Sequence, residues 1–307
     1  MSRLIVAGIT QIETIVKVKE LPIAFEPYTC EKDTIYIAAG GDSFNESLAL
    51  KWLGDEVDFM TVVGKNQDLS IFNPAEREVN LSTEYVLPIL EETPHDVLLY
   101  DARRKKQHFE DLKDVRDAKY DMSLVDPLVP KCDMIVLSNV NFCRPFIHLA
   151  KDNGKKLAVK IHSFKREKEI YNEDFLSNAD IIFFNDNSIN EEPYEFVKDM
   201  VKKYDPGIVI LGQGGEGAII YDKEKDFIVH YNAVKSVNIV NTAGAGNASF
   251  ACFLHYYLKF GDSKTAIHKA LLFAANKISY MGTSNGFMTE EQLEQWENVV
   301  WNPRGQM

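Results

Sequence analysis

Residues 241–250, with the sequence NTAGAGNASF, form a glycine-rich segment that leads into the apolar run 250–258. The length and composition of that run predict a helix, so Gly244 and Gly246 are expected at the turn where it begins. The first N–H groups of a helix lack partners within the helix and favour an anion. Glycines there let the backbone approach a phosphate where a Cβ atom would collide. The segment predicts an anion-binding turn, and the alternative is an ordinary helix start.

A second glycine pair lies near the amino end, in residues 39–54 (AGGDSFNESLALKWLG). Gly40 and Gly41 precede an amphipathic pattern that predicts a helix, and Gly54 marks its end. By itself, this segment is as typical of a plain strand-to-helix turn as of a functional site.

Short strand-like runs alternate with helical stretches along most of the chain. This rhythm predicts an α/β fold with a mainly parallel sheet and crossover helices. Two segments, at about 13–38 and about 85–110, show β-rich alternation and no convincing helix instead. The strand-like runs are residues 4–7, 134–137, 157–161, 181–184 and 208–211.

Together, the two glycine segments resemble the paired signatures of the ribokinase-like (pfkB) carbohydrate kinases. The family's Gly-Gly-x-x-x-Asn pattern is met by Gly40, Gly41 and Asn45. Its Asp-Thr-x-Gly-Ala-Gly-Asp pattern is met by residues 241–247, except that both acids are amides here.

The resemblance covers nearly the whole chain and implies a fold. We expect a single ribokinase-like domain over residues 1–307, with a parallel-rich central sheet flanked by helices. Segments 13–38 and 85–110 are expected to form a small β lid over the sugar site. Because such lids often pair between subunits in this family, a homodimer is also expected.

The resemblance also implies catalytic roles. Asn247 stands where the family has the general base, and Asn241 replaces the other acid. Gly244, Ala245 and Gly246 would form the anion-binding turn. A neutral amide is no useful proton acceptor, and general-base catalysis is worth roughly 10² to 10⁴ in rate. A slow enzyme is nevertheless a better prediction than an inactive one, because positioning and electrostatic stabilisation supply most of the rate acceleration in phosphoryl transfer.

On the sugar side, the family has a Gly-x-x-x-x-Asp stretch whose acid holds the sugar hydroxyls. Here Gly8 is followed at that spacing by Glu13, which keeps the carboxylate on a longer side chain. The alternative for Glu13 is a solvated strand end. The substrate-binding residues implied by the resemblance are Glu13, Gly40, Gly41 and Asn45.

On the nucleotide side, the family's Asn-x-x-Glu motif appears as residues 185–188 (NDNS), without its acid. Residues 212–217 (GQGGEG) match a Gly-x-x-Gly hairpin that borders the nucleotide in the family. They also fit the dinucleotide-binding pattern G-x-G-x-x-G, but that pattern must open a helix, whereas residues 218–221 predict a strand. A glycine hairpin without a ligand is the other alternative. The implied nucleotide-binding residues are Asn185, Gly214, Gly217 and Thr242.

His162 follows the predicted strand 157–161, at the end of the sheet where substrate-facing side chains lie in open α/β folds. A structural histidine is the favoured interpretation. Lys160 precedes it, and some relatives have an acid on this strand end.

The formal charge of −12 argues against a nucleic-acid or anionic-membrane partner. The four cysteines show no C-x-x-C spacing, which favours reduced thiols over disulfides or a zinc site. No apolar run reaches about 18 residues and no signal peptide is recognised, so the cytoplasm is the default location.

Three functions remain open. The first is an ATP- and magnesium-dependent kinase for a small sugar or related polyol, slowed by Asn247 or served by another base; its metal ligands are not assigned. The second is a non-catalytic protein of the same fold that binds a nucleotide or sugar in a regulatory role. The third is another α/β enzyme.

Overall fold

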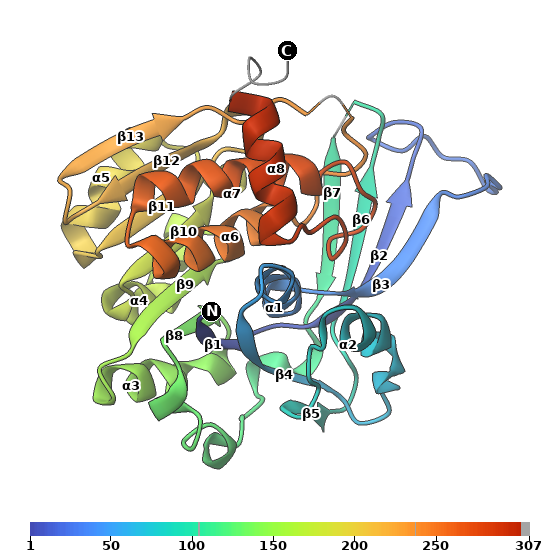
Figure 1. Cartoon of the computed structure of the whole chain (residues 1–307). Coiled ribbons are helices and arrows are strands. Elements are labelled where there is room, and N and C mark those ends of the chain that lie inside the picture. Colours follow the sequence, from blue (N-terminus) through green and yellow to red (C-terminus); the bar gives the residue numbers. More distant parts are fainter. Residues whose placement is uncertain (104, 237, 302–307) are drawn as a thin grey trace.

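The computed structural model describes residues 1–103, 105–236 and 238–301. They form a large sheet with helices on both faces and a smaller sheet that stands beside it (Figure 1). This is the α/β architecture with a parallel-rich sheet and flanking helices that the sequence predicts. The expectation of one domain over 1–307 stays a prediction.

The large sheet contains nine strands and is parallel except at one edge, where β11, β12 and β13 pair antiparallel. Helices cover both faces of this sheet, so the side chains of its inner strands are buried on both sides. The sequences of these strands are accordingly almost continuous apolar runs. In spatial order the strands are β13 (Phe227–Tyr231), β12 (Ala218–Asp222), β11 (Ile208–Gly212), β10 (Ile181–Asn185), β9 (Lys156–Ile161), β8 (Met134–Ser138), β1 (Arg3–Ala7), β4 (Glu56–Gly64) and β5 (Val86–Leu90).

Two hydrophobic cores separate the sheet from its two helix layers. Alternate residues of a strand point to opposite faces, so Val136 of β8 packs in one core and Ile135 in the other. The first core is covered by α1 (Asp42–Trp52), α2 (Asn73–Val79), α6 (Ala245–Phe260), α7 (Ser263–Lys277) and α8 (Glu290–Trp301). The second is covered by α3 (Arg144–Asp152), α4 (Glu169–Asn178) and α5 (Pro193–Tyr204).

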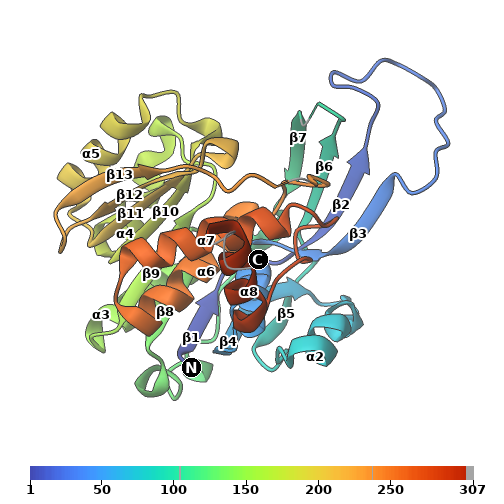
Figure 2. The same ribbon diagram turned by 45° about the horizontal axis from the view of Figure 1, so that its top comes forward.

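The smaller sheet has four strands in the order β3 (Ile35–Gly40), β2 (Gln11–Lys17), β6 (His95–Tyr100) and β7 (Lys106–Asp111). Both views show it beside the large sheet, with the connection between β2 and β3 projecting at its outer end (Figure 2). It takes strands from both segments predicted as the lid. β5 also falls in the second segment, but it pairs with β4 in the large sheet, so that lid boundary was drawn too early in the chain.

The two faces of the smaller sheet differ in chemistry. Cross-strand pairing aligns Glu13, Asp96 and Glu110 in one row, which places the three carboxylates on the same face. On the opposite face, Ile37 and Phe109 are exposed by 63% and 52%. The face with the carboxylates, the acidic face, also holds the buried Ile15 and Leu98, whereas the opposite, apolar face exposes its hydrophobic side chains.

Within the described part of the chain, no helix combines the length and apolar character needed to cross a membrane.

Candidate functional site

The glycine segment predicted to bind an anion lies at the start of α6. Gly244 caps the helix with φ of +77°, and the first helical bond runs from the N–H of Ala248 to its carbonyl at 3.0 Å. The N–H groups of the preceding residues of α6 lie before that bond and are available to a ligand. A Cβ atom on Gly244 would lie 2.4 Å from the carbonyl oxygen of Thr283. The turn therefore requires glycine and presents free donors at a helix N-terminus.

The side chain of Asn241 stabilises this turn. Its side-chain Oδ1 accepts a hydrogen bond from the N–H of Ala243 at 2.7 Å. An amide oxygen makes this bond as a carboxylate would, so the change from acid to amide leaves the turn intact.

Asn185 ends β10 and lies against the anion-binding turn. A Cβ atom on Gly246 would lie 2.8 Å from its Oδ1, and one on Gly212 would lie 3.6 Å from the same atom. The structure therefore brings Asn185, the α6 turn and the β11–β12 hairpin together. Thr242 is half-buried within the same turn.

The hairpin that contains Gly214 and Gly217 joins two antiparallel strands. It opens no α-helix, so the dinucleotide-binding alternative is wrong. A Cβ atom on Gly217 would lie 1.9 Å from the carbonyl oxygen of Tyr231, so packing alone explains that glycine. Gly214 has a φ of +54° and faces open space.

Glu13 lies on the acidic face of the smaller sheet and is 5% exposed. The interpretation of Glu13 as a solvated strand end is therefore wrong. Its Oε1 accepts a hydrogen bond from the N–H of Gly41 at 2.9 Å, and Gly41 caps α1 with φ of +97°. A Cβ atom on Gly40 would lie 2.0 Å from the carboxyl carbon of Glu13. Gly40 therefore leaves the space that this carboxylate occupies.

The environment of Glu13 makes its ionisation costly. Burial raises the pKa of Glu13 to about 7, and the nearby carboxylates of Asp96 and Asp42 add to the rise. Hydrogen bonds from Thr283 and Gly41 oppose it. The group therefore titrates near neutral pH.

Thr283 is a central residue that the sequence analysis missed. Its hydroxyl donates to the Glu13 carboxylate and lies 3.4 Å from Oδ1 of Asn45, while its backbone packs against Gly244. One residue thus connects the predicted sugar side to the anion-binding turn. The sequence signal was the small-residue run 282–286 (GTSNG), whose two glycines both have positive φ.

Asp42 is a second missed residue. Its Oδ1 accepts a hydrogen bond from Nζ of Lys160 at 2.6 Å, and both side chains are buried. Its Oδ2 lies 3.2 Å from Nδ1 of His162, whose Nε2 lies 3.1 Å from Oε1 of Glu110. Burial opposes ionisation of Asp42, yet Lys160 and His162 hold its pKa well below the usual range. Desolvation lowers the pKa of His162, but Asp42 and Glu110 outweigh it and raise the pKa to about 10.

Asn247 is the third residue of α6 and is 7% exposed. Among the residues that the structure describes, no cluster of three or more His, Cys, Asp or Glu side chains is placed to hold a metal. The arrangement thus offers anion-binding donors at one end and a buried carboxylate at the other. It suits a ligand that carries both a phosphate and hydroxyl groups, or two such ligands side by side.

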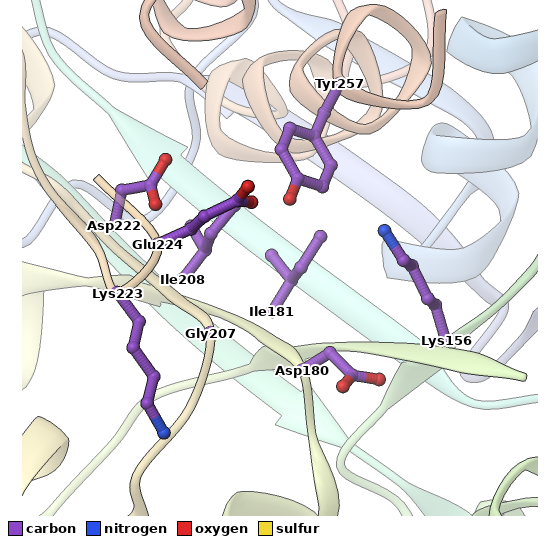
Figure 3. Close-up of a pocket in the computed structure, with 9 residues that line it drawn as sticks. All are labelled: Lys156, Asp180, Ile181, Gly207, Ile208, Asp222, Lys223, Glu224 and Tyr257. Carbon is purple, nitrogen blue, oxygen red and sulfur yellow. The ribbon is translucent and has the colours of Figure 1, made fainter. Parts of the chain in front are cut away.

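A hollow of about 260 Å³ lies elsewhere (Figure 3). It opens at the amino ends of β9, β10 and β11, whereas Lys160 and Asn185 lie at the carboxyl ends of their strands. Ligands of open α/β sheets bind at the carboxyl ends, so this hollow is separate from the candidate site. Its lining residues are Lys156, Asp180, Ile181, Gly207, Ile208, Asp222, Lys223, Glu224 and Tyr257.

Comparison with known proteins gives consistent results. The family model described as pfkB family carbohydrate kinase matches residues 1–290. Deoxyribokinase of Salmonella typhi is 25% identical over 315 residues, covering 95% of this chain and 97% of the relative. Ribokinase of Dictyostelium discoideum is 23% identical and covers 94% and 98%.

Solved structures share the fold. A microbiome-derived acarbose kinase superposes with a TM-score of 0.81 at 20% identity, covering 96% of this chain and 98% of its own. A crystal structure described as a putative ribokinase from Agrobacterium tumefaciens gives 0.83 at 16% identity, with 99% of both chains covered.

Gly244→Ala tests the close approach at the anion-binding turn. We expect it to weaken ATP binding at least about 10-fold and to cost about 1–3 kcal/mol more stability than Gly261→Ala, because a methyl group must displace Thr283. Gly261 has a similar φ of +66° but open space around it, so its change costs only about 1–2 kcal/mol of backbone strain. Urea unfolding and calorimetric titration measure both effects. Equal losses of stability and of ATP affinity in the two variants would contradict the close approach of Gly244 to Thr283.

Glu13→Gln tests the buried carboxylate. Because burial raises the folded pKa of Glu13 above its unfolded value near 4.5, ionisation costs nothing below about pH 4.5 and its full amount above about pH 7. The variant should therefore gain stability relative to wild type across this window, by at most about 3 kcal/mol. Urea unfolding at pH 5 and pH 8 measures this gain, with the exposed Glu20→Gln as control. A stability difference that does not change with pH would refute the assignment.

Proposed function

Because the chain belongs to the pfkB family of carbohydrate kinases, we propose that it transfers the γ-phosphoryl group of ATP to a hydroxyl of a sugar or related polyol. The observation that supports this most strongly is the Thr283 contact, which holds the buried Glu13 carboxylate beside the anion-binding turn of α6. Acceptor hydroxyl and phosphoryl group would thereby meet in one site, which is the main requirement for this transfer.

In this proposal each residue has a distinct task. Glu13 and Asn45 accept hydrogen bonds from sugar hydroxyls and orient the substrate, while Gly40 leaves room for the Glu13 carboxylate and the N–H of Gly41 donates to it. The N–H groups of the α6 turn donate to the transferring phosphoryl oxygens and stabilise their charge. Asn247 aligns the attacking hydroxyl through a hydrogen bond but leaves its proton to solvent or to the phosphoryl oxygens, which slows the reaction.

The nucleotide would lie along Asn185, Thr242 and the hairpin at Gly214 and Gly217. We expect magnesium to arrive with the ATP phosphates, since this ion keeps several waters and needs few protein ligands. The magnesium ion would offset the negative charge of the ATP phosphates. Asp186, half-buried and next to Asn185, would contact such a shell through water. Function in the cytoplasm stays a prediction.

The substrate is expected to be small. Relatives of this chain are named deoxyribokinase and ribokinase, and a solved relative with the same fold is a nucleoside kinase in complex with inosine. Deoxyribose, ribose and inosine are therefore the first acceptors to test.

A non-catalytic protein that binds a nucleotide or sugar is the second candidate. It is favoured by the amide of Asn247 at the position of the base, together with Ser188 at the position of the family's acid. In this case the site would bind its ligands without turnover.

Asn247→Asp separates the two candidates. The carboxylate restores a proton acceptor, so we expect phosphoryl transfer to rise by about 10² or more. Steady-state assays with ATP, magnesium and the three acceptors measure it, with the exposed Asn190→Asp as control. Wild-type turnover at about 1–100 s⁻¹ would exclude the non-catalytic protein. No transfer by either the wild type or Asn247→Asp would exclude the kinase.

We also propose that two copies of the chain pair through the apolar face of the smaller sheet. Ile35 and Ile37 of β3 and Phe109 of β7 leave more than half of their surface exposed, and a second copy would cover them. Ile37→Lys should then yield a monomer in analytical ultracentrifugation. Ile170→Lys, at an isoleucine of α4 that is 82% exposed, should leave the dimer unchanged. A wild-type monomer at micromolar concentration would refute the pairing.

A further inference from the structure

The smaller sheet is continuous with α1 at one edge and contacts the large sheet through a side chain at the other. β3 and β7 are its two outer strands. β3 leads through Gly41 directly into α1, whose first residue is Asp42, and β7 carries Glu110. Both carboxylates meet one side chain, that of His162, which directly follows β9 of the large sheet.

The imidazole of His162 uses both nitrogens in these contacts. Nδ1 lies 3.2 Å from Asp42 and Nε2 lies 3.1 Å from Glu110. A carboxylate beside each nitrogen favours the protonated imidazolium, so both contacts are ion pairs. The main chain of His162 is itself fixed, because its N–H donates to Oδ1 of Asn139 at 3.0 Å.

The two contacts differ in strength. The Asp42 side chain is 7% exposed and is also held by Lys160 at 2.6 Å. The Glu110 side chain is 31% exposed, and water competes for its contact with His162. The contact between His162 and Glu110 of β7 is therefore expected to break before the contact between His162 and Asp42.

We propose that His162 is a positioning residue that holds the smaller sheet closed over the candidate site by pairing with Glu110 of β7 while it stays fixed to Asp42 of α1. Opening proceeds by release of Glu110 at β7, while Asp42 keeps the junction between β3 and α1 in place. The acidic row of Glu13, Asp96 and Glu110 then becomes accessible from the β7 side. This role does not depend on the proposed kinase activity.

The other charged groups near the imidazolium fit this asymmetry. Asp96 lies next to Glu110 in the acidic row, and Nδ1 of His108 lies 3.5 Å from its Oδ1. This second pair joins β6 to β7 within the smaller sheet. It moves with the sheet and does not tie it to the large one.

Hydrogen–deuterium exchange of the full chain tests the proposal without substrate. In Glu110→Ala and in His162→Ala, which each remove one side of the contact, we expect amide exchange in residues 106–111 to be at least about 5-fold faster than in wild type. Exchange in residues 35–40 should stay unchanged in Glu110→Ala, since Asp42 keeps its partners. The double variant should exchange no faster than the faster single variant, because both changes remove one shared contact.

Two controls accompany these variants. His148→Ala removes an exposed histidine of α3, and Gln107→Ala shortens an exposed side chain of β7. Both should exchange like wild type over residues 106–111. Unchanged exchange there in Glu110→Ala would overturn the proposal, as would equal acceleration in residues 35–40 and 106–111. If His162→Ala does not fold, Glu110→Ala alone decides, because it alters only a partly exposed side chain at the sheet edge.

Discussion

The burial of the Glu13 carboxylate is the constraint on which the rest of the site depends. A buried carboxylate is costly unless hydrogen-bond donors surround it. Here the donors are the N–H of Gly41, at the start of α1, and the hydroxyl of Thr283. Satisfying one side chain therefore fixes the smaller sheet, α1 and the loop around Thr283 relative to one another. The same loop supports the anion-binding turn, because Gly244 packs against the Thr283 backbone.

The two amides of the second glycine segment have different consequences. A carboxylate that only accepts a hydrogen bond can be replaced by an amide, and Asn241 still accepts one from the Ala243 N–H. A carboxylate that must take up a proton cannot be replaced in this way, which is the position of Asn247 in the proposed reaction. In the proposed reaction, the chain thus keeps the geometry of the turn but loses the proton acceptor at its end. The proposal therefore separates binding from catalysis.

Much of the fold could be predicted from the sequence, because parallel strands buried on both faces are short continuous apolar runs. The run 134–137 is β8 to within one residue, and the family's fold is confirmed. β5 was wrongly included in the lid because it lies in the same β-rich segment without a convincing helix, and only pairing with β4 distinguishes it. Thr283 and Asp42 were missed because their local sequences indicate only a turn and a helix start. Their partners are distant in the chain, so only tertiary contacts reveal them.

The central claim is that the α6 turn is a working phosphate site. Calorimetric titration of the wild-type chain with ATP, with and without magnesium, tests it most directly. We predict saturable binding with a Kd below about 1 mM in the presence of magnesium, since free N–H groups at a helix N-terminus favour the charged phosphates. The absence of binding heat at millimolar ATP under both conditions would contradict the claim and leave the glycine turn a purely structural feature.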